Sequence, residues 1–253
     1  MTRCSREVGI IKSCVLGGAL AAGLALPAQA QNKLELSATA TLTTDYIFRG
    51  ISFTGNQPAI QGSFDATYGI FYAGVWASNI ELDGTTIEID YYAGIAPTWK
   101  GISFDIAGLY YTYPGAKDGG PELDYFELKT AASYTFFEKL TLGISNYWSP
   151  EFGGGGGDGD ALELSASYAF AGKLFNFFSP SVSALVGWQW VDNNNNFPGW
   201  DPYTYWNAGL TLGFMENWSI DVRYWDTDLN NTSCFGNVTF CDERVVGTLS
   251  ASF

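Results

Sequence analysis

The sequence predicts an all-β protein, a transmembrane antiparallel up-and-down β-barrel of about twelve strands. Three observations lead to this prediction. Apolar and polar residues alternate with a period of two along most of the chain after residue 30, which indicates strands with one apolar and one polar face. The chain opens with a pattern typical of an export signal. Short turns and longer loops alternate between the predicted strands, as they do in membrane barrels.

Residues 1–30 are predicted to be a cleaved signal peptide, and residues 31–253 the barrel. The first segment carries three basic residues, Arg3, Arg6 and Lys12. An apolar stretch and an Ala-x-Ala site follow, so we expect cleavage between Ala30 and Gln31. The apolar stretch is shorter than the roughly 20 residues that a spanning helix needs, which favours a cleaved signal over a signal anchor.

The mature chain is strongly acidic. Residues 1–30 hold three of the 12 basic and one of the 26 acidic residues, so the formal charge after cleavage is −16. Nucleic acid is therefore not an expected partner, because phosphate binding needs Lys and Arg surfaces. No apolar run of about 18 residues follows residue 30, which excludes helical membrane spans.

The first six predicted strands alternate clearly in all but one case. They cover residues 33–44, 59–68, 71–78, 86–95, 102–113 and 124–134. In the first of them, Leu34, Leu36 and Leu42 stand at even positions, while Glu35 and hydroxyl residues stand at odd ones. In residues 71–78 the positions of Tyr72 and Trp76 leave it undecided which side of the strand faces the lumen.

The other six predicted strands continue the pattern to the last residue. They cover residues 140–147, 161–170, 181–191, 203–214, 218–226 and 243–253. Strands of about ten residues are long enough to cross a bilayer at a tilt. A last strand that ends on Phe253 resembles the closing strand of bacterial outer-membrane barrels. We therefore expect Phe253 to act as the signal for the barrel-assembly machinery.

The connections between these strands predict the topology. Short links cover residues 69–70, 97–101, 135–139, 171–180 and 215–217, the fourth being longer. Loop-like stretches cover residues 50–58, 79–85, 114–123, 148–160, 192–202 and 227–242. Short turns lie on the periplasmic side of such barrels and long loops outside. The expected location is the bacterial outer membrane, with both termini in the periplasm.

A soluble barrel or sandwich would also show alternation, with its polar face turned to solvent. The export signal and the aromatic residues near the predicted strand ends argue against this alternative, because aromatic girdles mark the two membrane interfaces. The apolar faces also contain no cation, which would be costly in contact with lipid. Outer-membrane lipid is therefore an expected partner.

The polar faces would then surround the lumen. The candidate pore-lining residues are Glu35, Asp45, Arg49, Asp65, Glu88, Asp90, Asp105, Glu127, Lys129, Glu163, Asp221 and Arg223. Carboxylates outnumber cations, which predicts a preference for cations. Asp45 and Arg49 are four residues apart, so in a strand both would face the lumen. They would then either form part of a structural charge network or act on permeating solutes. The aromatic residues expected to occupy part of the lumen are Tyr92, Tyr111, Tyr113, Tyr147 and Trp225.

Six segments together show a family resemblance. They read TTDYIFRGIS at 43–52, PAIQGSFD at 58–65, YAGVWASN at 72–79, EIDYYAG at 88–94, LYYTYPG at 109–115 and NYWSPE at 146–151. This set is similar to the TorF-type porin family of bacterial outer-membrane barrels, and the similarity covers nearly the whole mature chain. The resemblance implies an outer-membrane porin. It supplies no catalytic or ligand-binding residues.

The residues needed for most catalytic sites are missing. The chain has no histidine, which excludes Ser-His-Asp and Cys-His nucleophiles and His-bearing zinc sites. Glu88 and Asp90 lie roughly 6.6–7 Å apart on one strand face, a spacing that suits glycoside hydrolysis, but an acidic lumen wall is the simpler explanation. Asp158 and Asp160 could bind Ca²⁺, although they lack an EF-hand pattern. We expect no enzyme activity, cofactor or metal.

Two cysteines remain after cleavage, Cys234 and Cys241. An even count in an exported chain predicts one disulfide, worth about 2–3 kcal/mol, with two unpaired thiols as the alternative.

The predicted function is a monomeric porin for passive diffusion of small hydrophilic solutes. The alternative is a non-conducting barrel that binds a partner or a surface through its outer loops. A specific pore for anionic substrates would need a basic lumen, which this sequence does not predict.

Overall fold

The structure is a computed structural model that describes residues 33–82, 84–116, 123–154, 157–192, 202–229, 234 and 239–253. The predicted signal peptide, with its cleavage site at Ala30 and Gln31, lies outside these residues.

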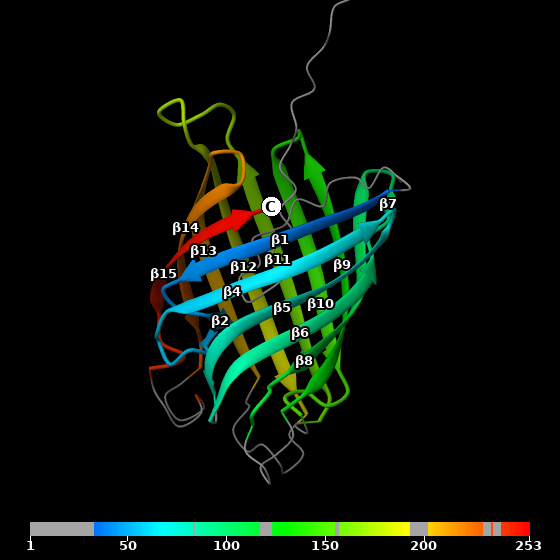
Figure 1. The fold of residues 1–253 in the computed structure, drawn as a ribbon, viewed down its shortest axis with the longest axis vertical. Coiled ribbons are helices and arrows are strands. Elements are labelled where there is room, and N and C mark those ends of the chain that lie inside the picture. The colour runs from blue at the N-terminus through cyan, green and yellow to red at the C-terminus, as the bar shows by residue number, and fades with distance from the viewer. Residues whose placement is uncertain are drawn as a thin grey trace, which may run out of the picture.

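Twelve long strands of the described chain close into a single antiparallel barrel (Figure 1). They are β1 (Leu34–Thr43), β4 (Ala59–Tyr68), β5 (Phe71–Leu82), β6 (Thr85–Ile95), β8 (Ile102–Thr112), β9 (Tyr125–Phe136), β10 (Leu140–Ser149), β11 (Gly159–Ala169), β12 (Ser179–Val191), β13 (Tyr203–Phe214), β14 (Trp218–Thr227) and β15 (Arg244–Ser252). Each long strand pairs with its neighbours in sequence, and β1 pairs with β15 to close the barrel. The prediction of an up-and-down barrel is confirmed.

Three further strands have two residues each. β2 (Ile47–Phe48) and β3 (Ile51–Ser52) form a separate hairpin, and β7 (Thr98–Trp99) pairs with the start of β8. The hairpin lies in the connection between β1 and β4, at the end of the barrel opposite the C-terminus (Figure 1).

The alternation places apolar side chains outside and polar side chains inside, as predicted. Leu36 is 59% exposed and Ile60 is 71% exposed, whereas the interleaved Asp65 is buried. A closed sheet leaves no unpaired strand edge in lipid, and its exposed apolar surface suits contact with lipid. The fold is therefore that of a transmembrane β-barrel. No helix in the described part of the chain has the length and apolar character to span a membrane.

Tight turns join the strands at the end that carries the C-terminus. Three of them place two successive non-glycine residues at positive φ, and these pairs are Phe137 with Glu138, Phe175 with Asn176, and Met215 with Glu216. Two positive φ values in succession define the turn whose twist matches that of the adjoining strands. This end is called the turn side below, and the opposite end the loop side.

One segment differs from the predictions, and one open point is resolved. Residues 79–85 were predicted to form a loop, but β5 continues to Leu82 and β6 begins at Thr85, with an irregularity in register after Asn79. The register irregularity accommodates the extra residues, so the strands extend almost to the tip. The facing of residues 71–78 is also resolved, because Trp76 is buried inside while Phe71 is exposed.

Candidate functional site: the barrel interior

A hairpin from the wall occupies the loop-side half of the barrel interior. Residues 45–54, here called the inserted hairpin, leave β1 and turn back through β2 and β3. Tyr46, Ile47, Ile51 and Phe53 are all at most 5% exposed. Apolar residues of the hairpin therefore pack against the inner wall, and the barrel has a dry core on this side.

Aromatic rings connect the hairpin to the wall. The Tyr46 ring lies 5.3 Å from that of Trp76 on β5, and the Phe48 ring lies 6.0 Å from that of Tyr111 on β8. Tyr111 in turn stacks on Tyr125 of β9 at 4.5 Å. Ring contacts at these distances add to the stability from burial alone. All five aromatic residues predicted to occupy the lumen are buried inside the barrel. Tyr111, Tyr113, Tyr147 and Trp225 lie in this half, and Tyr92 lies nearer the turn side, where it bonds to Asp65.

Arg49 lies at the tip of the inserted hairpin and reaches across to the wall. Its Nη2 lies 2.8 Å from Oε2 of Glu127 on β9, and its Nη1 donates to Oε1 of Gln189 on β12 at 2.8 Å. The guanidinium also lies 5.0 Å from the centre of the Tyr147 ring. Burial acts to lower the pKa of the Arg49 guanidinium, but Glu127 and the surrounding tyrosines together raise that pKa well above its ordinary value. Arg49 is therefore a permanent positive charge inside the barrel.

Gly50 allows the tip of the hairpin to approach the wall. Its φ is +86°, and a Cβ there would overlap the Thr227 side chain and lie 2.9 Å from Cβ of Tyr205. Only glycine meets both the conformational and the spatial requirement at this position.

Asp45 and Arg49 have separate partners. The residues from 44 onward do not continue β1, so the two side chains do not share a strand face as predicted. Asp45 accepts hydrogen bonds from the hydroxyls of Ser52 and Thr54, both at 2.7 Å, and forms an ion pair with Arg244 of β15 at 2.8 Å. The Asp45 carboxylate thus holds both arms of the hairpin and links them to the last strand.

The other candidate residues lie on the inner face of the wall. Lys129 forms an ion pair with Asp105 at 2.7 Å, and Arg223 with Asp221 at 3.0 Å. Glu163 accepts a hydrogen bond from Tyr205 at 2.7 Å, and Asp65 accepts one from Tyr92. Glu35 lies on the same inner face near the turn side, where it is partly exposed.

Several buried carboxylates are incompletely satisfied. Glu88 is fully buried, with Tyr46 and Tyr113 donating to its Oε1 at 3.4 and 3.5 Å. Within the described residues, four carboxylate oxygens have no hydrogen-bond partner: Oε2 of Glu88, Oδ1 of Asp90, Oε1 of Glu127 and Oε2 of Glu163. Leaving such an oxygen unpaired is costly, so these carboxylates would be stabilised by a cation placed beside them. No group of three or more His, Cys, Asp or Glu residues in the described parts of the chain could hold a metal ion.

The turn-side half of the interior has a different lining. Its inward residues are mostly Ser, Thr and Gly, but they include the carboxylates of Asp65, Asp105 and Asp221 and the rings of Tyr72 and Tyr92. Hydroxyl pairs connect adjacent strands, such as Thr39 with Ser63 at 2.9 Å and Thr135 with Thr141 at 2.9 Å. Inward residues such as Ser63, Ser165 and Ser183 remain partly exposed. Because these side chains face the inside of the barrel, this half is open to water.

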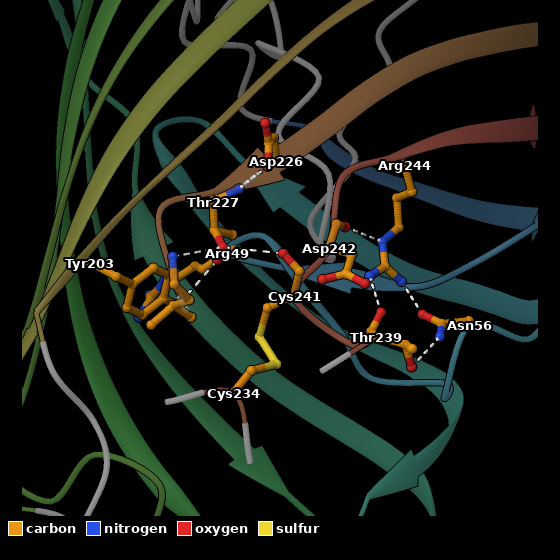
Figure 2. Close-up of a disulfide and its surroundings, with 11 residues drawn as sticks. Arg49, Asn56, Tyr203, Asp226, Thr227, Cys234, Thr239, Cys241, Asp242 and Arg244 are labelled. Carbon is orange, nitrogen blue, oxygen red and sulfur yellow. Dashed lines mark hydrogen bonds between the residues drawn. A yellow bond between two sulfur atoms is a disulfide. The ribbon is translucent and has the colours of Figure 1, made fainter. Parts of the chain in front are cut away.

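The predicted disulfide between Cys234 and Cys241 is present, and it lies beside the inserted hairpin (Figure 2). Both cysteines are buried in the apolar cluster that contains the hairpin. The Cys241 carbonyl accepts a hydrogen bond from the Thr227 hydroxyl at 3.2 Å, and the Phe240 carbonyl accepts one from the Ser52 amide at 2.9 Å. Arg244 donates to the Thr239 carbonyl at 2.5 Å and also to the Asn56 side chain.

The sequence reasoning missed the inserted hairpin, and with it the roles of Gly50 and Arg244. A signal was present, because residues 46–48 are Tyr, Ile and Phe in succession. Three consecutive apolar residues do not fit a wall with one polar face, and they suit a segment buried on all sides.

Comparison with known proteins gives a family and a fold. A family model described as "Bacterial protein of unknown function (Gcw_chp)" matches residues 27–253. A solved structure of the KdgM porin in complex with disordered oligogalacturonate is similar with a TM-score of 0.53 and 6% identity, over 86% of this chain and 97% of that chain. A NanC porin structure is similar with a TM-score of 0.50 and 8% identity, over 87% of this chain and 99% of that chain. At such identities the likeness shows the fold alone. No curated protein matches the sequence.

Proposed function

The chain belongs to the Gcw_chp family of bacterial proteins of unknown function, and we propose that it is an outer-membrane porin through which small hydrophilic solutes diffuse, with a preference for cations. The proposal includes membership of the TorF-type porins, a monomeric state, insertion by the barrel-assembly machinery, and both termini in the periplasm. It also includes a role without catalysis, which the lack of histidine supports.

The imbalance of charge inside the barrel is the observation that carries this proposal. The described inner face and inserted hairpin hold four cations, Arg49, Lys129, Arg223 and Arg244, each in an ion pair with a carboxylate. Further carboxylates remain, namely Asp65, Glu88, Asp90 and Glu163. A wall with such an excess attracts cations and repels anions at close range.

This charge distribution argues against the ligand named for one structural neighbour. Oligogalacturonate, named with the KdgM porin, is an anion. The acidic interior described above would repel such a solute. We therefore propose cations and small neutral solutes as the substrates of this barrel.

Planar-bilayer recording under a KCl gradient tests the proposal. We expect channel events whose reversal potential has the sign for cation selectivity. Replacing Asp65, Glu88, Asp90 and Glu163 by their amides should reduce that selectivity, whereas Glu138→Gln, an exposed change on the turn side, should leave it unaltered. Anion selectivity in the wild type would contradict the proposal. Liposome swelling with sugars, amino acids and charged solutes then ranks the substrates.

The packed loop-side half favours a second candidate, a non-conducting barrel that acts through its outer loops. Its aromatic cluster and inserted hairpin are buried as in a protein core. Deletion of residues 148–160 or 227–242 tests this candidate. Loss of binding to a cell surface with unchanged membrane permeability would support it over the porin.

A further inference from the structure

We propose that the inserted hairpin, residues 45–54, is a plug that closes the barrel from the loop side, and that the Cys234–Cys241 disulfide with Thr239, Phe240 and Arg244 is a clasp that holds the plug. The channel would then open when the clasp releases the hairpin. This inference rests on the proposed porin function.

The plug contacts the wall on several sides. Tyr46 packs on β5, Arg49 bonds to β9 and β12, and Gly50 lies against β13 and β14. These strands are spread around the ring, because in sheet order β5 is separated from β9 by β6 and β8, and β9 from β12 by β10 and β11. A segment that touches all of them occupies much of the cross-section.

The plug is not part of the wall. β2 and β3 pair only with each other, in a sheet separate from the barrel. The plug can therefore leave without breaking any strand pairing of the barrel. The connection from Thr43 to Ala59 is roughly 50 Å long if extended. Because Thr43 and Ala59 are paired in neighbouring strands, its middle can reach roughly 25 Å from them, which is enough to carry the plug out of the loop end.

The clasp supplies the polar contacts between the plug and the last strand. The Ser52 amide donates to the Phe240 carbonyl at 2.9 Å, and Arg244 forms the ion pair with Asp45 at 2.8 Å. Figure 2 shows the Arg244 guanidinium with hydrogen bonds to Asn56 and to Thr239, which also bond to each other. The disulfide ties Cys241 to a second point in the chain, and the Thr227 hydroxyl fixes the Cys241 carbonyl to β14. Loss of the disulfide should therefore loosen Phe240 and Thr239, and with them the plug.

Single-channel recording of three proteins tests both parts. In the plug-replacement variant, residues 45–54 are replaced by an equally long Gly-Ser linker, and the clasp variant is Cys234→Ser with Cys241→Ser. We expect the wild type to be mostly closed and the plug-replacement variant to be open nearly all the time. The clasp variant should raise the open fraction about tenfold over the wild type. The control is Glu151→Gln, an exposed loop-side change, which should match the wild type.

The outcomes separate this inference from the proposed function. A wild type that conducts as fully as the plug-replacement variant overturns the plug and leaves the porin intact. A clasp variant that behaves as the wild type overturns the clasp. A plug-replacement variant without conductance, but with the heat-dependent electrophoretic mobility of a folded barrel, refutes the porin function itself.

Discussion

The loop-side and turn-side halves of the interior are built from the same twelve strands but are filled in opposite ways. On the loop side, tyrosines, buried carboxylates and the inserted hairpin form a dry cluster. On the turn side, small hydroxyl residues and glycines predominate around a few charged residues such as Asp65 and Asp105, and they leave room for water. The outer face is similarly apolar along both halves, so contact with lipid does not require this difference.

If the barrel conducts as proposed, this difference implies that the loop side controls permeation. A wall of small polar side chains places little restriction on a solute, whereas a packed cluster with charges selects by both size and sign. Substitutions on the loop side should therefore change stability and conductance together, and substitutions of the small hydroxyl residues on the turn side should change neither strongly.

The largest effect is expected when the charge at the tip of the hairpin is lost. Arg49→Met leaves the buried Glu127 carboxylate without its cation, which should lower the free energy of unfolding by about 3–5 kcal/mol. Denaturant titration measures this loss. The double variant Arg49→Met with Glu127→Gln should recover much of the stability. If the double variant is as unstable as the single one, the ion pair does not account for the difference between the halves.

A smaller effect is expected at Gly50. Gly50→Ala places a Cβ against Thr227 and Tyr205 at a positive φ, which should cost about 1–3 kcal/mol and raise the open fraction of the channel. Gly172→Ala on the turn side is the matched control, because its φ is +82° and no atom lies within 4 Å of the added Cβ. The control shares the backbone strain but not the clash. Equal conductance of the two variants would show that the close approach at Gly50 does not hold the hairpin.

The smallest effect is expected in the turn-side half. Thr39→Ala removes the hydroxyl pair with Ser63, which is partly exposed, so the unfolding free energy should change by about 0.5 kcal/mol or less. Ion selectivity should stay the same in bilayer recordings. A marked change in selectivity would mean that the small hydroxyl residues also discriminate between solutes, and would remove the distinction drawn above.

The strands of the wall were predictable from the sequence because the position of a residue among its immediate neighbours decides which face its side chain occupies. Leu34, Leu36 and Leu42 alternate with Glu35 and hydroxyl residues, and a period of two assigns each side chain to one face. The same reasoning placed Glu88, Asp90 and Glu127 inside. Strand ends were less certain, since residues 79–85 look polar and loop-like but form the extended tip of a hairpin.

The filling of the interior was not predictable in the same way. Contacts such as Arg49 with Glu127, or Asp45 with Arg244, join residues 78 and 199 positions apart, and no local period encodes them. The two-residue pairing of β2 with β3 is also too short to leave a pattern in the sequence. The requirement for glycine at position 50 arises from its closeness to Tyr205, which the sequence does not show.

The pairing of β1 with β15 has a consequence for assembly. The hairpin starts at the end of β1, and Arg244, which holds Asp45, begins β15. The stem of the hairpin and its anchor thus stand on the two strands that form the seam, and they meet only when the last strand docks. During assembly the ion pair between Asp45 and Arg244 cannot form before β15 pairs with β1. Closure of the ring and attachment of the hairpin to the last strand are therefore one event.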